Sequence, residues 1–227
     1  MATKLIQEST LTNIANAIRV KTGKVDTMTP SEMVTEIGNI SGGGTDTQLV
    51  AFIEDTITTP FYNEDIVNVG KQGFYGKSFP SLELPNATTS ATQSFGGNSI
   101  KAYKLPKLAT IGSNLFQGSS GLQIADFTAM NVTGGNMLFG CSNCKILIFR
   151  KSDGIVALSG TGNISNSGMT GTDARIYVPQ SLVAQYQQGT NWATYYANNP
   201  NLFQPLEGSP FENPNYDPLA VLAQLAS

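Results

Sequence analysis

Two cysteines are the residues whose type and spacing most readily suggest chemistry. They lie in the sequence Cys141-Ser142-Asn143-Cys144, a spacing used by zinc ribbons and by redox dithiols. A structural zinc site needs four ligands, and the chain has neither a second such pair nor a histidine. We therefore predict two small buried thiols, with a disulfide or a reactive pair as the alternative.

Acidic pairs and a glycine-lysine step are the other candidates for catalysis. Residues 73–78 end in Gly-Lys-Ser, like a phosphate-binding loop, but Lys71 stands where that loop requires its first glycine. The adjacent carboxylates at 54–55 and 64–65 would serve a glycosidase only if two carboxyls faced each other across a cleft. Because the chain also lacks a histidine as general base, we predict no catalytic residue, no cofactor and no metal.

The composition excludes several classes of partner. Charged residues make up 13% of the chain and the net charge is −3, so the clustered Lys and Arg of a nucleic-acid interface are not expected. The apolar runs are far shorter than the roughly 20 residues that span a bilayer, so we expect no membrane insertion. The N-terminal residues also lack the apolar core of a signal peptide. The surface must be covered by neutral polar side chains and glycine.

A repeat predicts the elements that position these residues. A phenylalanine followed within two residues by glycine returns every 21 to 23 residues, at Phe74, Phe95, Phe116 and Phe139. A fixed period of this length indicates units that bury their apolar faces by stacking on their neighbours. We therefore predict a β-rich repeat solenoid over residues 49–206.

Each repeat unit is expected to contribute one short strand with a buried face, because its apolar residues alternate. Phe95, Phe116 and Phe139 are expected to fill equivalent inner corners. The residues expected at equivalent inward strand positions are Leu84, Leu105, Phe127, Ile148 and Val178.

Residues 1–41 are predicted to form a small N-terminal α-helical hairpin. Thr29-Pro30-Ser31-Glu32 has the pattern of a capping box, with Thr29 as N-cap and Glu32 reaching back to its amide. Helices this short are marginal alone, so a partner should bury their apolar stripe. A Gly-rich linker at 42–48 follows. The predicted assembly residues on the stripe are Leu11, Ile14, Ile18, Met33 and Ile37.

The same N-terminal segment resembles a short module found on many phage tail, baseplate and fibre proteins, where it precedes unrelated C-terminal domains. Residues 11–19, 21–23, 28–33 and Ile37 carry the resemblance. It implies attachment to a virion or oligomerisation. The alternative is a generic helical hairpin packed on the solenoid end.

The repeats resemble the BspA-type leucine-rich repeat, whose unit places an Ile-Gly pair, a Phe, a Gly-Cys step and a Leu in this order. Residues 111–122 and 137–145 carry the pattern, and Cys141 stands at that family's Cys position. Phe95 lacks the Ile-Gly partner, and residues 118–120 read Gly-Ser-Ser in place of the Gly-Cys step. We therefore expect irregular coils.

Residues 176–186, followed by Trp192 and Tyr195, resemble the terminal unit of that family, which implies a C-terminal capping helix. Leu182 and Tyr186 also fall on one helical face by spacing alone. The remaining residues, 207–227, form a Pro-rich tail that ends in a short apolar helix candidate. Such a tail is either a frayed end or an arm that docks on a neighbouring subunit.

One insertion interrupts the repeat. From Ile148 to Val178 the spacing is 30 residues, where the other units use 21 or 22, and the surplus lies in the uncharged segment 159–171. Insertions in repeat proteins become loops on one face, often the binding face, although an unconstrained loop would have the same composition. The predicted recognition residues are Thr161, Asn163, Ser165, Asn166, Ser167 and Thr170.

The two resemblances imply a non-enzymatic phage structural protein of the tail-fibre, baseplate or receptor-binding type, which presents its repeat domain for host recognition or virion assembly. The implied partners are other virion proteins and a host cell-surface glycan or protein, and the implied oligomer is a homotrimer. The implied location is the virion, assembled in the cytoplasm of the host bacterium. The alternatives are a capsid or neck fibre or decoration protein, and a virion-associated polysaccharide depolymerase.

Overall fold

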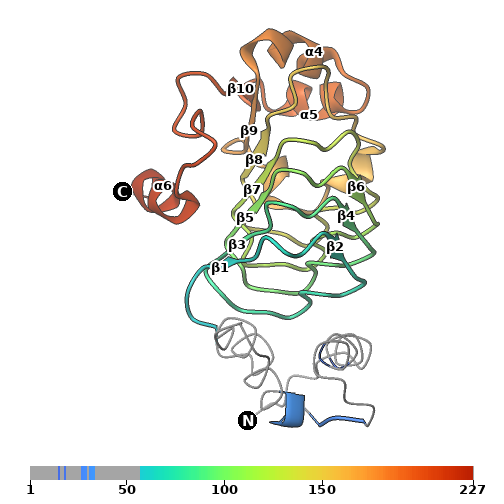
Figure 1. Ribbon diagram of the computed structural model, residues 1–227. Coiled ribbons are helices and arrows are strands. Elements are labelled where there is room, and N and C mark those ends of the chain that lie inside the picture. The colour runs from blue at the N-terminus through green and yellow to red at the C-terminus, as the bar shows by residue number, and fades with distance from the viewer. Residues whose placement is uncertain (1–14, 16–17, 19–26, 30, 34–56, 227) are drawn as a thin grey trace. The chain divides into compact units, whose positions relative to one another are not determined.

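The computed structural model describes residues 15, 18, 27–29, 31–33 and 57–226 (Figure 1). Contacts divide the chain into two units, Met1–Thr58 and Thr59–Ser227. The second unit is a β-rich solenoid, as the repeat predicts. Within the described part of the chain, no helix has the length and apolar character needed to cross a membrane.

Two parallel sheets run along the solenoid (Figure 1). Pairings such as Phe61 with Leu82 and Ala102 with Ile124 advance the chain by one repeat, which confirms stacking in place of an antiparallel sandwich. The smaller sheet joins β2 (Asn68–Val69), β4 (Thr89–Ser90) and β6 (Thr110–Ile111). The larger sheet joins, in order, β1 (Phe61–Tyr62), β3 (Ser81–Glu83), β5 (Ala102–Leu105), β7 (Ile124–Phe127), β8 (Ile146–Phe149), β9 (Arg175–Val178) and β10 (Phe203–Pro205).

A column of glycines closes one turn in each coil. Gly76, Gly97, Gly118 and Gly140 have φ angles of 71°, 62°, 74° and 78°, a region that side chains with a Cβ rarely adopt. Their amides bond to the next coil, as where Gly118 N donates to the Phe139 carbonyl at 2.8 Å. The repeated left-handed residue is what makes these glycines a periodic signal in the sequence.

A ladder of aromatic rings fills the core behind this column. Phe74, Phe95 and Phe116 are buried, with 5.6 Å between successive ring centroids. The prediction for Phe139 was wrong: its side chain is 41% exposed, and Leu138 takes the buried position. Leu138 follows Phe116 by the same spacing that separates the turn glycines, whereas Phe139 stands one residue later.

The inward strand positions continue the core on the side of the larger sheet. Leu84, Leu105, Phe127 and Val178 are buried there as predicted. Ile148 does not belong to this row, because its register partners are Asp126 and Tyr177 on the opposite face of the sheet. The inward residue of that strand is Phe149, whose ring stacks on Phe127 at 6.1 Å.

Helices follow β9 at one end of the stack, where η3 (Gln180–Leu182) leads into α4 (Val183–Gln188) and α5 (Trp192–Asn198). Tyr186 and Trp192 are buried against Phe149, and both bond to Val156: the Val156 amide donates to Tyr186 Oη at 2.8 Å, and Trp192 Nε1 donates to the Val156 carbonyl at 2.7 Å. The chain then returns as β10, which pairs with β9 in parallel and forms the last strand of the larger sheet.

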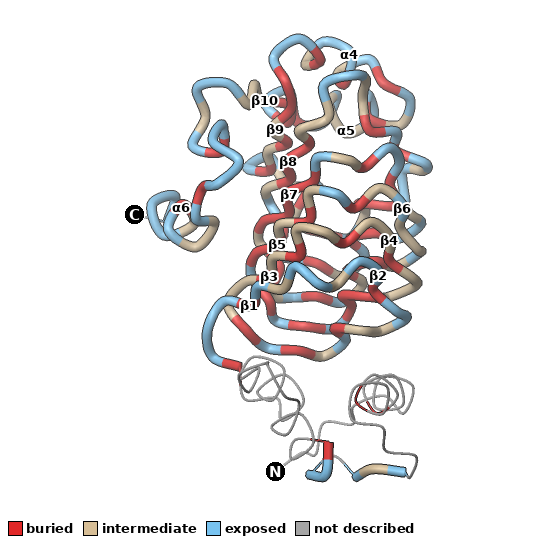
Figure 2. The backbone as a smooth tube through the Cα atoms, in the orientation of Figure 1, coloured by how far each residue is buried: buried red, intermediate tan, exposed pale blue. Residues whose placement is uncertain are grey.

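The C-terminal residues 207–226, here called the strap, lie on the outer face of the larger sheet (Figure 1). The strap ends in α6 (Pro218–Leu225). Its N-cap is Asp217, whose carboxylate accepts hydrogen bonds from the amides of Leu219 and Ala220. Buried positions run along the stack of strands, and exposed ones predominate on the strap (Figure 2). The strap therefore covers part of the outer face of the larger sheet in the same chain. The sequence had suggested a frayed end or an arm that docks on a neighbouring subunit. The buried residues of this contact are Ala102, Ile124, Ile148, Phe211, Tyr216 and Val221.

In the first unit, the described residues contain the predicted capping box. The Glu32 carboxylate accepts the Thr29 amide at 2.6 Å, and the Glu32 amide donates to Thr29 Oγ1 at 3.3 Å. Ile18 and Met33 are buried. The linker at 42–48 and three predicted assembly residues, Leu11, Ile14 and Ile37, lie outside the described residues.

Candidate recognition surface

The cysteine pair is part of the core. Cys141 and Cys144 are free thiols and both are buried, as predicted. Burial raises the pKa of Cys141 to about 12 and that of Cys144 well above its usual value. The Cys141 thiol donates to the Phe116 carbonyl of the preceding coil at 3.0 Å. This geometry gives the thiols a packing role and leaves them protonated at neutral pH.

The other chemical candidates are turns and paired charges. Asn63 Oδ1 accepts the amides of Asp65 and Ile66, so residues 64–65 belong to an exposed turn. Residues 73–78 form the turn that carries Phe74 into the core, while 54–55 lie outside the described residues. No three potential metal ligands cluster among the residues that the structure describes.

An open pocket of about 300 Å³ lies beside the end of β8. Its charged residues are already paired: Arg150 binds Asp126, and Lys151 binds Asp153. The pocket is also lined by Thr128, Ala129, Asn131 and Ser152. The single carboxylate in its lining, from Asp153, does not make the facing pair that a glycosidase requires.

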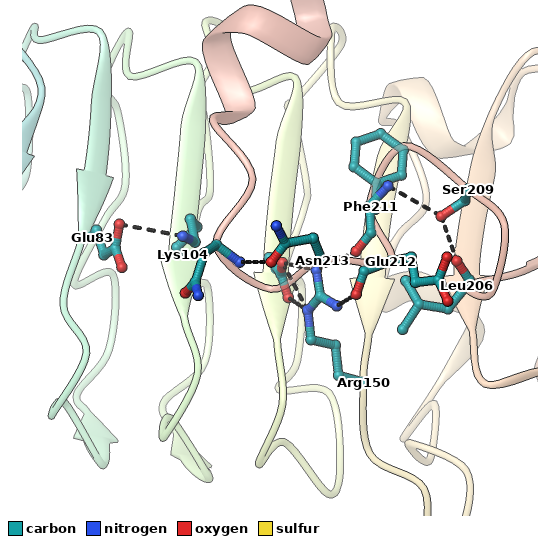
Figure 3. Close-up of polar contacts among 10 residues, drawn as sticks. Glu83, Lys104, Arg150, Leu206, Ser209, Phe211, Glu212 and Asn213 are labelled. Atoms are coloured by element: carbon teal, nitrogen blue, oxygen red, sulfur yellow. Dashed lines mark hydrogen bonds and ion pairs between the residues drawn. The ribbon is translucent and has the colours of Figure 1, made fainter.

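The outer face of the larger sheet carries a row of charges beneath the strap. Lys104 Nζ lies 3.4 Å from the Glu83 carboxylate, and Arg150 donates to the Phe211 and Glu212 carbonyls of the strap (Figure 3). The ring of Tyr216 is within 5.8 Å of the Arg150 guanidinium. The part of this face under the strap is therefore an internal contact.

The predicted recognition loop is packed into the solenoid and contributes residues to its core. It contains η1 (Thr161–Asn163) and η2 (Gly168–Thr170), and Ile164 and Met169 are buried within it. Asn163 is also buried. Its side-chain amide donates to Thr133 Oγ1 at 3.0 Å and to Ser159 Oγ. Ser167 is buried as the cap of η2.

The other predicted loop residues remain accessible. Thr161, Asn166 and Thr170 are exposed, and Ser165 is half-buried. Deleting the loop would therefore remove core residues together with its surface. Of the exposed residues, Asn166 is the one that backbone hydrogen bonds connect to the preceding turns.

The carbonyl of Asn166 continues a column of acceptors, which on the other coils belong to the residues that precede the turn glycines. The Gly140 amide donates to the Asn166 carbonyl at 3.0 Å, just as the Gly118 amide donates to the carbonyl of Phe139. The Gly97 amide likewise donates to Gln117 at 2.8 Å, and the Gly76 amide to Gly96 at 3.2 Å. Tyr75, Gly96, Gln117 and Phe139 therefore occupy the same position on successive coils, and Asn166, whose own φ angle is 50°, accepts the equivalent hydrogen bond on the next coil.

Two aromatic rings of this column face solvent. Tyr75 is 46% exposed and Phe139 is 41% exposed. The Tyr75 ring reaches over the bare backbone of the next coil, because a Cβ added to Gly97 would meet its Cζ atom at 2.8 Å. We call Tyr75, Gln117, Phe139 and Asn166 the turn stripe.

An amide ladder runs beside the turn stripe. Gln72 Nε2 donates to Gln93 Oε1 at 3.2 Å, and Gln93 Nε2 donates to Gln117 Oε1 at 2.9 Å. Gln72 and Gln93 have φ angles of 57° and 56°, which costs a side-chain-bearing residue about 1 kcal/mol or more. Glycine or asparagine would adopt this conformation more readily, but neither has the length of glutamine that the ladder uses.

Sequence reasoning did not identify Tyr75, Gln117 or Phe139 as surface residues. The signal that could have found them is the position directly before each left-handed glycine, which holds a large side chain on three of four coils. The predicted assembly stripe is only partly described, and of its residues Ile18 and Met33 are buried.

Compared with protein-family profiles and with curated protein sequences, the chain has no match.

Proposed function

We propose that the chain is a non-enzymatic phage structural protein of the tail-fibre, baseplate or receptor-binding type. Its solenoid, in this proposal an array of BspA-like leucine-rich repeats closed by its C-terminal helices, presents a surface for host recognition or virion assembly. The N-terminal module attaches the protein to the virion, and the protein acts as a homotrimer.

The observation that carries the proposal is the uncharged turn stripe on a stack of hydrogen-bonded coils. Its side chains are aromatics and amides that reach solvent, while Asp126 and Arg150 on the outer face of the larger sheet are paired with each other, and Arg150 also donates to the strap. Binding residues are commonly held in loops on a rigid scaffold, and a solenoid repeats such loops at a constant rise.

The separate first unit supports the attachment role. Its capping box stands where the resemblance to phage attachment modules requires it, and Met33 directly after the box is buried. Cys141 supports the repeat assignment, since its buried thiol bonds to the preceding coil at the position where the BspA-type unit places a cysteine.

The test is incorporation of variants into particles. A chain that begins at Thr45 should keep the circular dichroism of the solenoid, sediment as a species smaller than the trimer expected of the full chain, and be missing from purified particles. Met33→Asp should reduce incorporation in the full chain, whereas the matched exposed change Thr27→Asp should not. Incorporation of the shortened chain at the full-length level would contradict the attachment role.

A further inference from the structure

We propose that the turn stripe binds a neutral, extended polysaccharide that lies along the solenoid axis. The proposal names the partner of the recognition function above and rests on that function for the biological source of the polysaccharide. The binding chemistry itself depends only on the side chains of the stripe.

The rise of the coils suits a chain of sugars. Neighbouring strands lie about 4.8 Å apart, so the stripe from Tyr75 to Asn166 extends over about 19 Å. A hexopyranose residue in an extended polymer is about as long as one coil is high. A linear glycan can therefore meet chemically similar positions on successive coils.

The two exposed rings supply stacking surfaces. The face of an aromatic ring is electron-rich and attracts the weakly positive C–H groups on the apolar face of a pyranose. Tyr75 extends over the glycine backbone of the neighbouring coil, because residues 96 and 97 have no side chains to lift it. Phe139 offers the second ring beyond Gln117.

The amides between and beside the rings supply directional hydrogen bonds. Within the described part of the chain, Gln117 Nε2 and Gln72 Oε1 have no protein partner, although the opposite ends of both amides are fixed in the ladder. The side-chain amide of Asn166 also has no partner among the described residues. These groups can donate to and accept from sugar hydroxyls without reorganising the ladder.

The absence of charge selects a neutral partner. None of the residues in 72–76, 93–97, 114–118, 136–140 and 163–167 is acidic or basic; of the two lysines that flank the first segment, Lys77 is buried and Lys71 is exposed four residues before Tyr75. An anionic glycan or a nucleic acid would require Lys or Arg at its contacts. The stripe therefore favours neutral hexose polymers over uronate- or sialate-containing ones.

The experiment measures binding of the full-length protein to immobilised six-residue oligomers of neutral hexoses, N-acetylhexosamines and rhamnose, with hyaluronate and polysialate as charged comparators. We expect at least one neutral oligomer to bind and the charged polymers not to bind. Tyr75→Ala and Phe139→Ala should each weaken binding about ten-fold or more, as expected for a stacking anchor. Tyr75→Phe should bind like the native protein.

Tyr62→Ala is the matched control, because Tyr62 is equally exposed but lies on β1 outside the stripe, and its binding should be unchanged. The proposal is overturned if no neutral oligomer binds at millimolar concentration, if the charged polymers bind equally well, or if both ring-to-alanine variants bind like the native protein. The assay needs no virion. Glycan binding by a protein that is missing from particles would leave this inference standing and remove the proposed virion role.

Discussion

Arg150 binds Asp126 through three hydrogen bonds of 2.9 to 3.1 Å while the same guanidinium donates to two carbonyls of the strap. Both side chains are less than a tenth exposed. The pair joins neighbouring strands to each other and to a segment that follows more than 60 residues later. The Arg150–Asp126 pair therefore attaches the strap to the strands of the solenoid.

Replacing Arg150 by Met should destabilise the protein by about 3–5 kcal/mol, because the change leaves the Asp126 carboxylate buried without its partner. Urea unfolding at neutral pH measures the loss. The control is Lys145→Met, which removes the exposed ion pair with Asp173 and should cost less than about 1 kcal/mol. Equal losses in the two variants would contradict the role assigned to Arg150.

The same variant has a predicted pH dependence. Burial raises the pKa of Asp126, and Arg150 opposes that rise, so its removal should raise the pKa further. A folded-state pKa above the unfolded value of about 3.9 stabilises the fold as pH falls. The stability gap between native protein and variant should therefore narrow between about pH 7 and about pH 4.5. A gap that stays constant or widens would show that Asp126 is not the responsible group.

Phe116 and Phe139 should respond very differently to truncation. Phe116→Ala removes a fully buried ring that contacts Phe95 and Tyr103, and should cost about 3–5 kcal/mol. Phe139→Ala removes a partly exposed ring and should change stability by no more than about 0.5 kcal/mol. Thermal unfolding of the two variants checks the core register, and comparable losses would contradict it.

These two phenylalanines also show how far the sequence predicts the fold. The repeat period was sufficient to predict stacked coils with a strand in each. It did not fix the register near Phe139, because Phe139 stands directly before the left-handed Gly140, whereas the buried side chain of each coil stands two residues before that glycine. The four residues of β8 are all apolar, because the strap buries the outer face of that strand while Phe149 lies in the core. Without alternating polar residues, the sequence did not indicate which side chains of β8 point inward.

The residue type before each turn glycine can be read from the sequence, but which residues of the turns and of the loop face solvent cannot. The two-residue strands of the smaller sheet are too short to show a period, and the predicted loop residues divide between buried and exposed only once the coil is built. Asn163 and Asn166 are alike in sequence, yet one bonds inside the coil and the other faces solvent.

Close stacking of backbones predicts a strong difference between two glycines. A Cβ at Gly112 would lie 2.4 Å from the Ala91 carbonyl carbon, whereas a Cβ at Gly70 would meet nothing within 4 Å. Gly112→Ala should therefore destabilise the protein by about 1–3 kcal/mol or more, and Gly70→Ala by no more than about 0.5 kcal/mol. Chemical denaturation measures both, and a tolerated Gly112→Ala would contradict the packing of these coils.

The thiols should be unreactive in the folded protein. Burial raises the pKa of both, so almost no thiolate is present at about pH 8. A colorimetric disulfide reagent should label neither cysteine in the native state and both in concentrated guanidinium chloride. Rapid labelling of the native protein would contradict the core assignment of Cys141 and Cys144.

The central proposal, that this is a virion attachment and recognition protein, is tested most directly by gold labelling of the solenoid on purified phage particles. We expect label on every particle, at the tail fibres or the baseplate. Label on the capsid or neck would favour the decoration or neck-fibre alternative. Particles that carry no label, from lysates that contain the protein, would contradict the proposed function.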